Sequence, residues 1–209
     1  MTRIAILDDH RIVIDGLKLL LSGDPDFVIG GEYTRGEDLL KGLKDETCEL
    51  VLTDIMMPEM DGLEVALRVK EQFPSVRVLA LSMNGDGQLA DRMIEEAGVC
   101  GYLLKTAGKD ELLTALRAVR DGQTYFSTEI LNELHSYRKI RRENEEINLT
   151  AREIDIIQCM AEDLSNRAIA ERLFISERTV ETHRKNIFRK TGMHSALSLV
   201  EFARKRKLI

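Results

Sequence analysis

The sequence predicts two folds in one chain of 209 residues: an α/β domain with a five-stranded, doubly wound parallel sheet, followed by an all-α domain of four helices. In the first half, short apolar runs alternate five times with segments of helical periodicity, which is typical of a parallel sheet with helices on both faces. The charge changes sign along the chain. Residues 1–125 carry 14 Lys and Arg against 23 Asp and Glu, a net charge of −9, whereas residues 149–209 carry 12 against 8, a net charge of +4. We therefore expect a domain at 1–122, a charged and partly helical linker at 123–147, and a second domain at 148–209.

The composition narrows the class of protein. At 44% hydrophobic and 32% charged, the chain can bury real cores. No apolar run approaches the roughly 20 residues that span a bilayer, and the first residues do not form a signal peptide. Cys48, Cys100 and Cys159 form neither a metal-binding pair nor a disulfide framework, as expected for reduced thiols. We expect a cytoplasmic protein without a membrane partner, whose basic second domain binds a polyanion.

The expected elements of the first domain follow in strict alternation. Five apolar runs are the expected strands: Ile4–Leu7, Phe27–Ile29, Leu50–Leu52, Val76–Leu81 and Tyr102–Leu104. The periodic segments between and after them are the expected helices: Ile12–Leu21, Glu37–Leu43, Leu63–Phe73, Leu89–Ala97 and Asp110–Arg120.

Polar residues stand at the carboxyl ends of the expected strands, where parallel sheets bind their ligands. Asp8 and Asp9 end the first strand, Asp54 the third, Ser82 the fourth and Lys105 the fifth. Clustered carboxylates repel one another, and a ligand set of oxygens alone favours Mg²⁺. Lys105 and Ser82 can hold the oxygens of a phosphoryl group, which leaves Asp54 as the nucleophile that forms an aspartyl phosphate.

In these residues the first half resembles the receiver domain of two-component response regulators, which has a flavodoxin-like fold. The resemblance covers about residues 1–122 through Asp8-Asp9, Asp54, Pro58, Gly62, Ser82 and Lys105. It implies that a cognate sensor histidine kinase phosphorylates Asp54. It also implies Mg²⁺ on Asp9, Asp54 and the backbone carbonyl of Met56, with Asp8 helping through water, and a switch pair of Ser82 and Tyr102. Thr106 replaces the proline that often follows the conserved lysine of receivers.

The linker offers two interpretations. Ser127 can cap a helix that carries Ile130, Leu131, Leu134 and Tyr137 on one face, and residues 138–146 are then almost wholly charged. Such a segment is either a solvated tether or a helix that docks on a domain and transmits a signal.

Four helices are expected in the second domain because each has a start signal. Thr150 with Glu153 forms a capping box, and Ser165, Ser176 and Ser195 can cap the others. Gly192 is placed to end the third helix. The second and third helices join around residues 173–176, which is the format of a helix-turn-helix, and Val180 and Ile187 of the third helix should point inward.

The second half resembles the LuxR-type DNA-binding domain over about residues 148–207, and the whole chain resembles a response regulator of the NarL/FixJ type. The resemblance implies double-stranded DNA as a partner and a homodimer on activation. Its third helix would meet the major groove through one set of side chains: Arg178, Thr179, Glu181, Thr182, His183, Lys185, Asn186, Arg189 and Lys190.

The leading interpretation is a phosphorylation-controlled DNA-binding regulator that is not an enzyme, and two alternatives to it remain. One is a DNA-binding regulator of the same fold that works without phosphorylation; the acidic residues and Lys105 argue against it. The other is an aspartate-nucleophile phosphatase of the haloacid-dehalogenase type. That family needs Asp-x-Asp after its first strand, whereas residues 8–10 are Asp-Asp-His.

Overall fold

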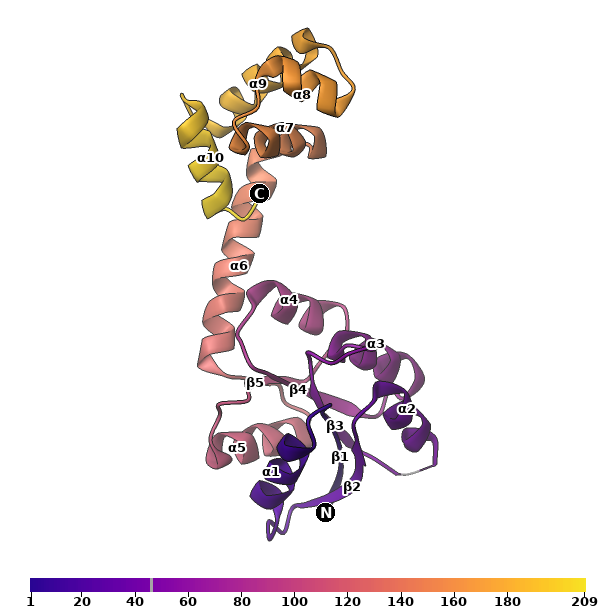
Figure 1. Ribbon diagram of the computed structural model, residues 1–209. Helices are drawn as coiled ribbons and strands as arrows, with labels where there is room; N and C mark the ends of the chain where they lie inside the picture. Colours follow the sequence, from indigo (N-terminus) through magenta and orange to yellow (C-terminus); the bar gives the residue numbers. More distant parts are fainter. Residues whose placement is uncertain (46) are drawn as a thin grey trace. The chain divides into compact units, whose positions relative to one another are not determined.

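The computed structural model describes residues 1–45 and 47–209, which divide into two compact units, Met1–Tyr137 and Arg138–Ile209. Figure 1 shows the sheet in the first unit and helices throughout the second. The two fold classes expected from the sequence are therefore both present.

The first unit is built on one parallel sheet, in which the described strands number six and follow the order β2-β1-β3-β4-β5-β6. The strands are β1 (Thr2–Leu7), β2 (Phe27–Tyr33), β3 (Leu50–Asp54), β4 (Arg77–Ser82), β5 (Gly101–Leu104) and β6 (Tyr125–Phe126). The doubly wound topology is confirmed, but the expected number of five strands was wrong. β6 has two residues, too few to show a periodic pattern, and it exists because Tyr125 N–H donates to the Cys100 carbonyl and Ser127 N–H to the Tyr102 carbonyl.

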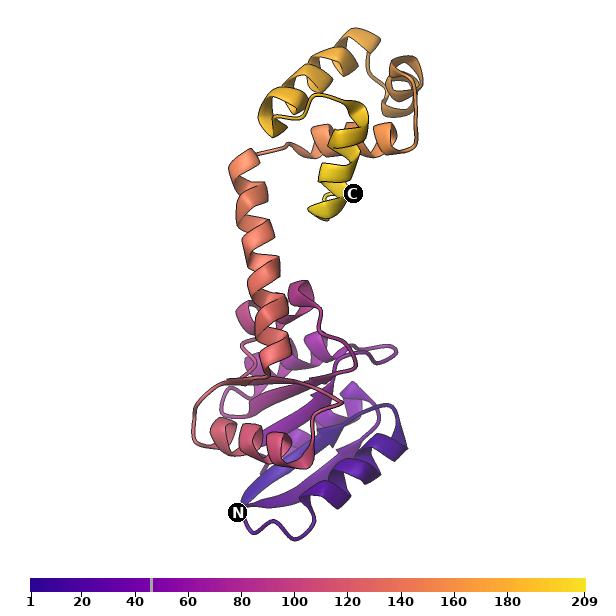
Figure 2. The ribbon, with the colours of Figure 1, turned by 90° about the vertical axis from the view of Figure 1, so that its left-hand side faces the viewer.

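Helices cover both faces of the sheet (Figures 1 and 2). They are α1 (Arg11–Leu21), α2 (Gly36–Asp45), α3 (Gly62–Gln72), α4 (Gly87–Glu95) and α5 (Lys109–Arg120). Ile4, Ile6 and Leu52 pack with α1 and α5 on one face. Ala5, Val51 and Tyr102 pack with α2, α3 and α4 on the other. Alternate strand residues thus fill two cores, and the apolar runs are buried on both sides, as a parallel sheet requires.

The linker region contains one long helix, α6 (Thr128–Ile147). Ile130 is fully buried and Leu134 nearly so, and both belong to the core that contains Tyr102. Leu131, expected on the same face, is 47% exposed. Ser127 precedes the helix as expected, but its buried Oγ makes no hydrogen bond to any described residue, so the expected side-chain cap is not formed. Up to Tyr137, α6 is a docked helix of the first unit rather than a solvated tether.

The second unit is a helical domain around its own core. Its further helices are α7 (Ala151–Ala161), α8 (Asn166–Leu173), α9 (Glu177–Thr191) and α10 (Ala196–Lys205). The four expected caps are confirmed: Thr150, Ser165, Ser176 and Ser195 each accept from a backbone N–H of the first turn, and Gly192 ends α9 with φ 70°. Val180 and Ile187 are fully buried, as expected for the inner face of α9.

Candidate functional site

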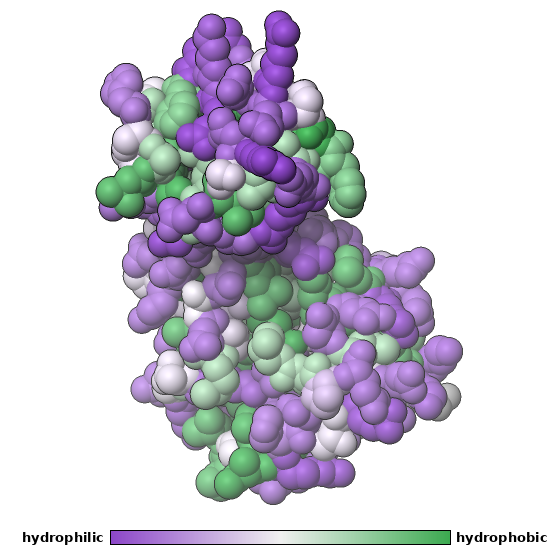
Figure 3. Space-filling model, turned by 45° about the horizontal axis from the view of Figure 1, so that its top comes forward, coloured by the Kyte–Doolittle hydropathy of each residue, from purple (hydrophilic) through white to green (hydrophobic). Residues whose placement is uncertain are grey.

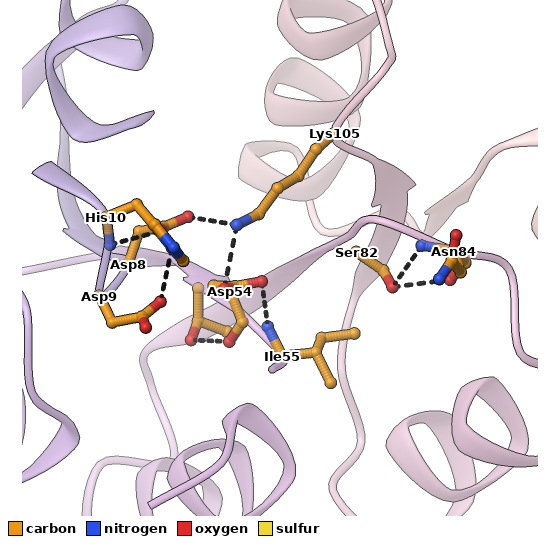
Figure 4. Close-up of polar contacts among 9 residues, drawn as sticks. Asp8, Asp9, His10, Asp54, Ile55, Ser82, Asn84 and Lys105 are labelled. Carbon is orange, nitrogen blue, oxygen red and sulfur yellow. Dashed lines mark hydrogen bonds and ion pairs between the residues drawn. The ribbon is translucent and has the colours of Figure 1, made fainter. Parts of the chain in front are cut away.

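Three charged side chains meet at the carboxyl edge of the sheet. The Lys105 Nζ lies 2.6 Å from Asp8 Oδ2 and 3.0 Å from Asp54 Oδ2 (Figure 4). Asp8 is 1% exposed and Asp54 3%. β1 and β3 are neighbours at the point where the strand order reverses, so their ends flank the usual ligand crevice of such sheets. The sequence-based expectation that these side chains converge is confirmed by these distances.

Asp9 and His10 extend this cluster. Ligand atoms of Asp8, Asp9, His10 and Asp54 all lie within 4.8 Å of one another. Asp9 Oδ1 is a buried atom that makes no hydrogen bond among the described residues, although His10 Nδ1 lies 2.9 Å away. Three clustered carboxylates, two of them nearly fully buried, are suited to a hard divalent cation. The donor set therefore fits Mg²⁺.

The charge balance of the site also favours a bound cation. Burial lowers the pKa of Lys105, but hydrogen bonds and ion pairs with Asp8 and Asp54 outweigh it, and the net effect raises the pKa. Lys105 therefore stays cationic. One ammonium faces three carboxylates, so the site retains an excess of negative charge that a bound cation would neutralise.

Asp54 is held by its own backbone neighbourhood. Ile55 N–H donates to Asp54 Oδ1 at 2.8 Å, and Gly62 N–H donates to the Ile55 carbonyl at 2.8 Å. A Cβ at Gly62 would lie 2.2 Å from the Asp54 carbonyl oxygen, so only glycine permits this approach. Met56 follows with a side chain that is 69% exposed.

The two residues expected to form the switch pair, Ser82 and Tyr102, differ in whether their side chains are already in the position expected after phosphorylation. The Ser82 Oγ donates to the Asn84 carbonyl at 2.7 Å, and Figure 4 shows it turned toward Asn84 rather than toward Asp54. The ring of Tyr102, in contrast, is fully buried. Burial raises the pKa of the Tyr102 phenol and the nearby Ser82 opposes this, yet the hydroxyl has no hydrogen-bond partner in the described part of the chain.

The residues expected on the outer side of α9 are accessible to different degrees. Arg178, Glu181, Thr182, Lys185 and Arg189 are exposed, whereas Thr179, His183 and Asn186 are half-buried. The Thr182 hydroxyl donates to the Arg178 carbonyl, four residues earlier. The helix thus presents a mixed face of cations, hydroxyls and one carboxylate.

Lys190 is engaged inside the second unit. Its Nζ lies 2.7 Å from Glu153 Oε2 and 2.8 Å from the Asn148 carbonyl. Burial raises the pKa of Glu153, but hydrogen bonds from Lys190 and Thr150 prevail and lower it. Lys190 therefore binds α9 to the start of α7.

One residue of the acidic cluster was not recognised from the sequence: His10, whose Nδ1 lies 2.9 Å from Asp9 Oδ1. It could have been found because it directly follows the acidic pair. Glu153 was recognised only as part of a capping box, and its ion pair with Lys190 depends on a contact that no spacing rule indicates.

Comparison with known proteins agrees with this geometry. The family model "Response regulator receiver domain" matches residues 4–117, and "Bacterial regulatory proteins, luxR family" matches residues 147–203. A putative transcriptional regulator of Pseudomonas aeruginosa is 34% identical over 209 residues, which cover 100% of both chains. The crystal structure of the response regulator ChrA, from a heme-sensing two-component system, is 33% identical, with a TM-score of 0.57 and coverage of 99% and 98%. RcsB of Salmonella typhimurium is 23% identical, with a TM-score of 0.71 and coverage of 97% and 98%, a likeness in fold alone.

Proposed function

Because the chain belongs to the response regulators that join a receiver domain to a luxR-family regulatory domain, we propose that it is a DNA-binding transcription regulator switched by phosphorylation of Asp54. The observation that carries this proposal is the pairing of Lys105 with two buried aspartates at the end of the central strands. The domain division 1–122, 123–147 and 148–209 belongs to the same proposal. The phosphoryl donor is a sensor histidine kinase, and the site of action is the cytoplasm.

In the proposed reaction, a carboxylate oxygen of Asp54 attacks the phosphorus, and the bond to the donor breaks as the new P–O bond forms. The ammonium of Lys105 already contacts Asp54 and is placed to pair with the oxygens of the incoming group. Ser82 supplies a hydroxyl from the neighbouring strand end. Near-complete burial of Asp54 strengthens these interactions because water is excluded.

Mg²⁺ would be held by Asp9, Asp54 and the Met56 backbone carbonyl, with Asp8 assisting. Bound there, it supplies the positive charge that lets a phosphoryl group approach a set of carboxylates. The convergence of Asp8, Asp9 and Asp54 ligand atoms within 4.8 Å of one another supports this assignment.

Phosphorylation would then be sensed by Ser82. Its hydroxyl must leave the Asn84 carbonyl to reach the phosphoryl group, which changes the loop between β4 and α4. Tyr102 needs no inward movement, because its ring is already buried in the core that also contains Ile130 of α6. We propose that the switch in this chain depends on Ser82, with Tyr102 as a fixed neighbour, and that activation produces a homodimer.

The proposed DNA contacts are residues of α9 that form no ion pair with another helix among the described residues. They are Arg178, Thr179, Glu181, Thr182, His183, Lys185, Asn186 and Arg189. Lys190 is left out of this set because its ammonium is already paired with Glu153. The basic charge of residues 149–209 supports duplex DNA as the polyanion.

An Asp54→Asn variant tests the phosphorylation site. Incubated with acetyl phosphate and Mg²⁺, the wild-type chain should gain about 80 Da in intact mass spectrometry, the mass of one phosphoryl group. The variant should gain nothing while keeping its circular dichroism spectrum. Asp61→Asn is the matched control, since Asp61 is an exposed helix cap on the following loop, and it should be phosphorylated normally. Equal adducts on wild type and Asp54→Asn would contradict the assignment.

The same experiment separates the alternatives. A regulator that works without phosphorylation would show no adduct and no response to beryllofluoride. A phosphatase would release inorganic phosphate over many turnovers, whereas a receiver is modified once per molecule. The absence of Asp-x-Asp after β1 and the helix-turn-helix of the second unit favour the regulator.

A further inference from the structure

Phe174 occupies the turn between α8 and α9 in an unusual state. Its backbone is left-handed, with φ 55° and ψ 44°, and its side chain is 94% exposed. The side chain of a large aromatic residue is normally buried, because burial removes its apolar surface from water. Phe174 therefore exposes nearly all of its ring.

The backbone conformation makes this residue type more unusual still. A position with left-handed φ at the end of a helix normally carries glycine, or asparagine, since a Cβ crowds the neighbouring backbone there. The other described non-glycine residues with positive φ all have polar side chains: Glu59, Asn148, Asp163 and Lys207. Phe174 thus combines a strained backbone with an apolar side chain in water, and neither favours the folded state.

The turn itself is rigidly held. Ile175 N–H donates to the Ala170 carbonyl at 3.0 Å, and the Arg152 guanidinium donates to the Leu173 carbonyl. Leu173 and Ile175 pack against the core of the domain. The residue between them must point outward, so the fold fixes the direction of the Phe174 side chain without using it for packing.

Phe174 lies just before α9, the helix proposed to contact DNA. Ser176, two residues later, caps α9, and the exposed residues Glu177 and Arg178 follow at once. The face of the C-terminal unit seen in Figure 3 is mostly hydrophilic, with hydrophobic residues among the hydrophilic ones. Among the large hydrophobic residues of the described chain, Phe174 is the most exposed, and in this unit only Leu197, at 71%, is exposed as well.

We propose that Phe174 is a DNA-contacting residue, which packs on deoxyribose edges and thymine methyl groups at the rim of the groove that α9 enters. The inference rests on the proposed DNA-binding function and adds an apolar contact to its polar ones. Binding DNA would remove the ring from water, which compensates for its exposure in the free protein. Such a contact carries no charge, so it adds affinity without adding to the salt dependence.

The test compares wild type with Phe174→Gly, using a duplex that the wild-type chain has selected from a random library. Glycine suits the left-handed turn, so the thermal midpoint of the C-terminal unit should be equal or higher. Affinity should nevertheless fall, by roughly three- to thirtyfold, because the apolar contact is lost. The slope of log affinity against log salt should stay the same. A variant that folds at least as well and binds less well separates a DNA contact from a structural role.

Two further variants complete the design. Phe174→Trp keeps an aromatic ring and should bind within about threefold of wild type. Asp163→Gly places glycine at another left-handed position of the same domain and should not weaken binding, because losing a carboxylate does not reduce attraction to phosphates. Unchanged DNA affinity of Phe174→Gly would overturn the inference. If transcription fell while DNA affinity stayed the same, the inference would also be overturned, and the ring would be assigned to contact with a protein partner. If the wild-type chain selects no duplex, the proposed function itself fails.

Discussion

At the scale of single residues, two lysine side chains have different roles because their partners differ. Lys105 and Lys190 both pair with buried carboxylates. Lys105 lies between two aspartates at the edge of the sheet, where a phosphoryl group can compete for it. Lys190 joins the capping box of α7 to α9, where it stabilises the domain. The surroundings of each ammonium therefore support the proposed role of Lys105 in phosphoryl binding and a structural role for Lys190.

The Lys190–Glu153 pair makes a prediction about stability and pH. The pKa of Glu153 is lowered in the folded state, so its contribution is fully present above the unfolded value of 4.5 and is lost as the pH falls through the folded pKa. Lys190→Met should destabilise the C-terminal unit at pH 7 by roughly 1–3 kcal/mol, since the carboxylate of Glu153 loses its cation. The cost should shrink as the pH falls below 4.5 and through the lowered pKa of folded Glu153, because a protonated carboxyl no longer needs the cation.

Urea unfolding of both proteins at pH 7 and at a series of pH values below 4.5 measures this. Arg189→Met is the matched control, because Arg189 is the exposed neighbour on the same helix, and its change should stay below about 0.5 kcal/mol. Equal stability of wild type and Lys190→Met at pH 7 would refute the structural role and return Lys190 to the candidates for DNA contact.

Glu181 makes a prediction about base recognition. A carboxylate on this face of α9 weakens the attraction to DNA phosphates, so we expect it to have another role. It can accept a hydrogen bond from the N4 amino group of cytosine, or it can form an ion pair with Lys185 four residues later. Glu181 is exposed, and no ion pair joins it to Lys185 in the described structure. This favours base recognition. Glu181→Gln should therefore change the preferred base at one position per half-site.

Selection from a random duplex library with both proteins tests this, and identical sequence preferences would exclude base recognition. Lys185→Ala is the control. Loss of a phosphate contact should weaken binding about equally for all sequences and reduce the salt slope by about one unit.

At the scale of elements, the loop between β4 and α4 connects Ser82, the proposed switch residue, to a helix that packs on α6. Ser82 bonds to the Asn84 carbonyl, and a few residues later Gly87 begins α4. A Cβ on Gly87 would lie 2.4 Å from the Glu133 carbonyl oxygen and 2.8 Å from the Tyr137 Cβ. The backbones of α4 and α6 are thus in close contact, so a movement of this loop would also displace α6.

This contact predicts opposite outcomes at two neighbouring glycines. Gly87→Ala should destabilise the first unit by roughly 1–3 kcal/mol, because the new methyl group meets backbone that cannot move aside. Gly85→Ala should be neutral or slightly stabilising, since its Cβ would meet the Glu133 side chain at an ordinary 3.4 Å. Urea unfolding followed by circular dichroism compares them. Equal effects at both positions would show that α6 does not pack on α4 in solution.

At the scale of the whole molecule, phosphorylation must change how the two units act together. A ligand shifts such an equilibrium only by its difference in affinity for the two states. The net charges of −9 in residues 1–125 and +4 in residues 149–209 are opposite in sign, and we expect them to attract each other before phosphorylation. In the described residues, no helix is both long and apolar enough to cross a bilayer.

Activation should produce dimers that bind DNA more tightly. With beryllofluoride and Mg²⁺, sedimentation should give about twice the monomer mass, and affinity for the selected duplex should rise roughly five- to 150-fold, the usual range of allosteric coupling. Asp54→Asn is the control and should respond in neither assay. Unchanged mass together with unchanged affinity in the wild-type chain would contradict the prediction.

The sequence by itself determined the alternation of strands and helices, the residues at the strand ends and the helix caps of the second domain. These features depend on local patterns: alternate strand residues face two cores, and a capping serine bonds within three residues of itself. The meeting of Asp8, Asp54 and Lys105 could also be expected, because the carboxyl ends of parallel strands lie at one edge.

Only the tertiary structure decided the rest. β6 pairs with the edge of β5, the buried Ser127 Oγ does not form its expected cap, and Lys190 forms an ion pair with Glu153. The exposed ring of Phe174 likewise follows from a turn fixed by Arg152 and by its two core-facing neighbours. In each case the partner is distant in sequence or the outcome depends on burial, and no local spacing records which of several possible partners a side chain will meet once the chain is packed.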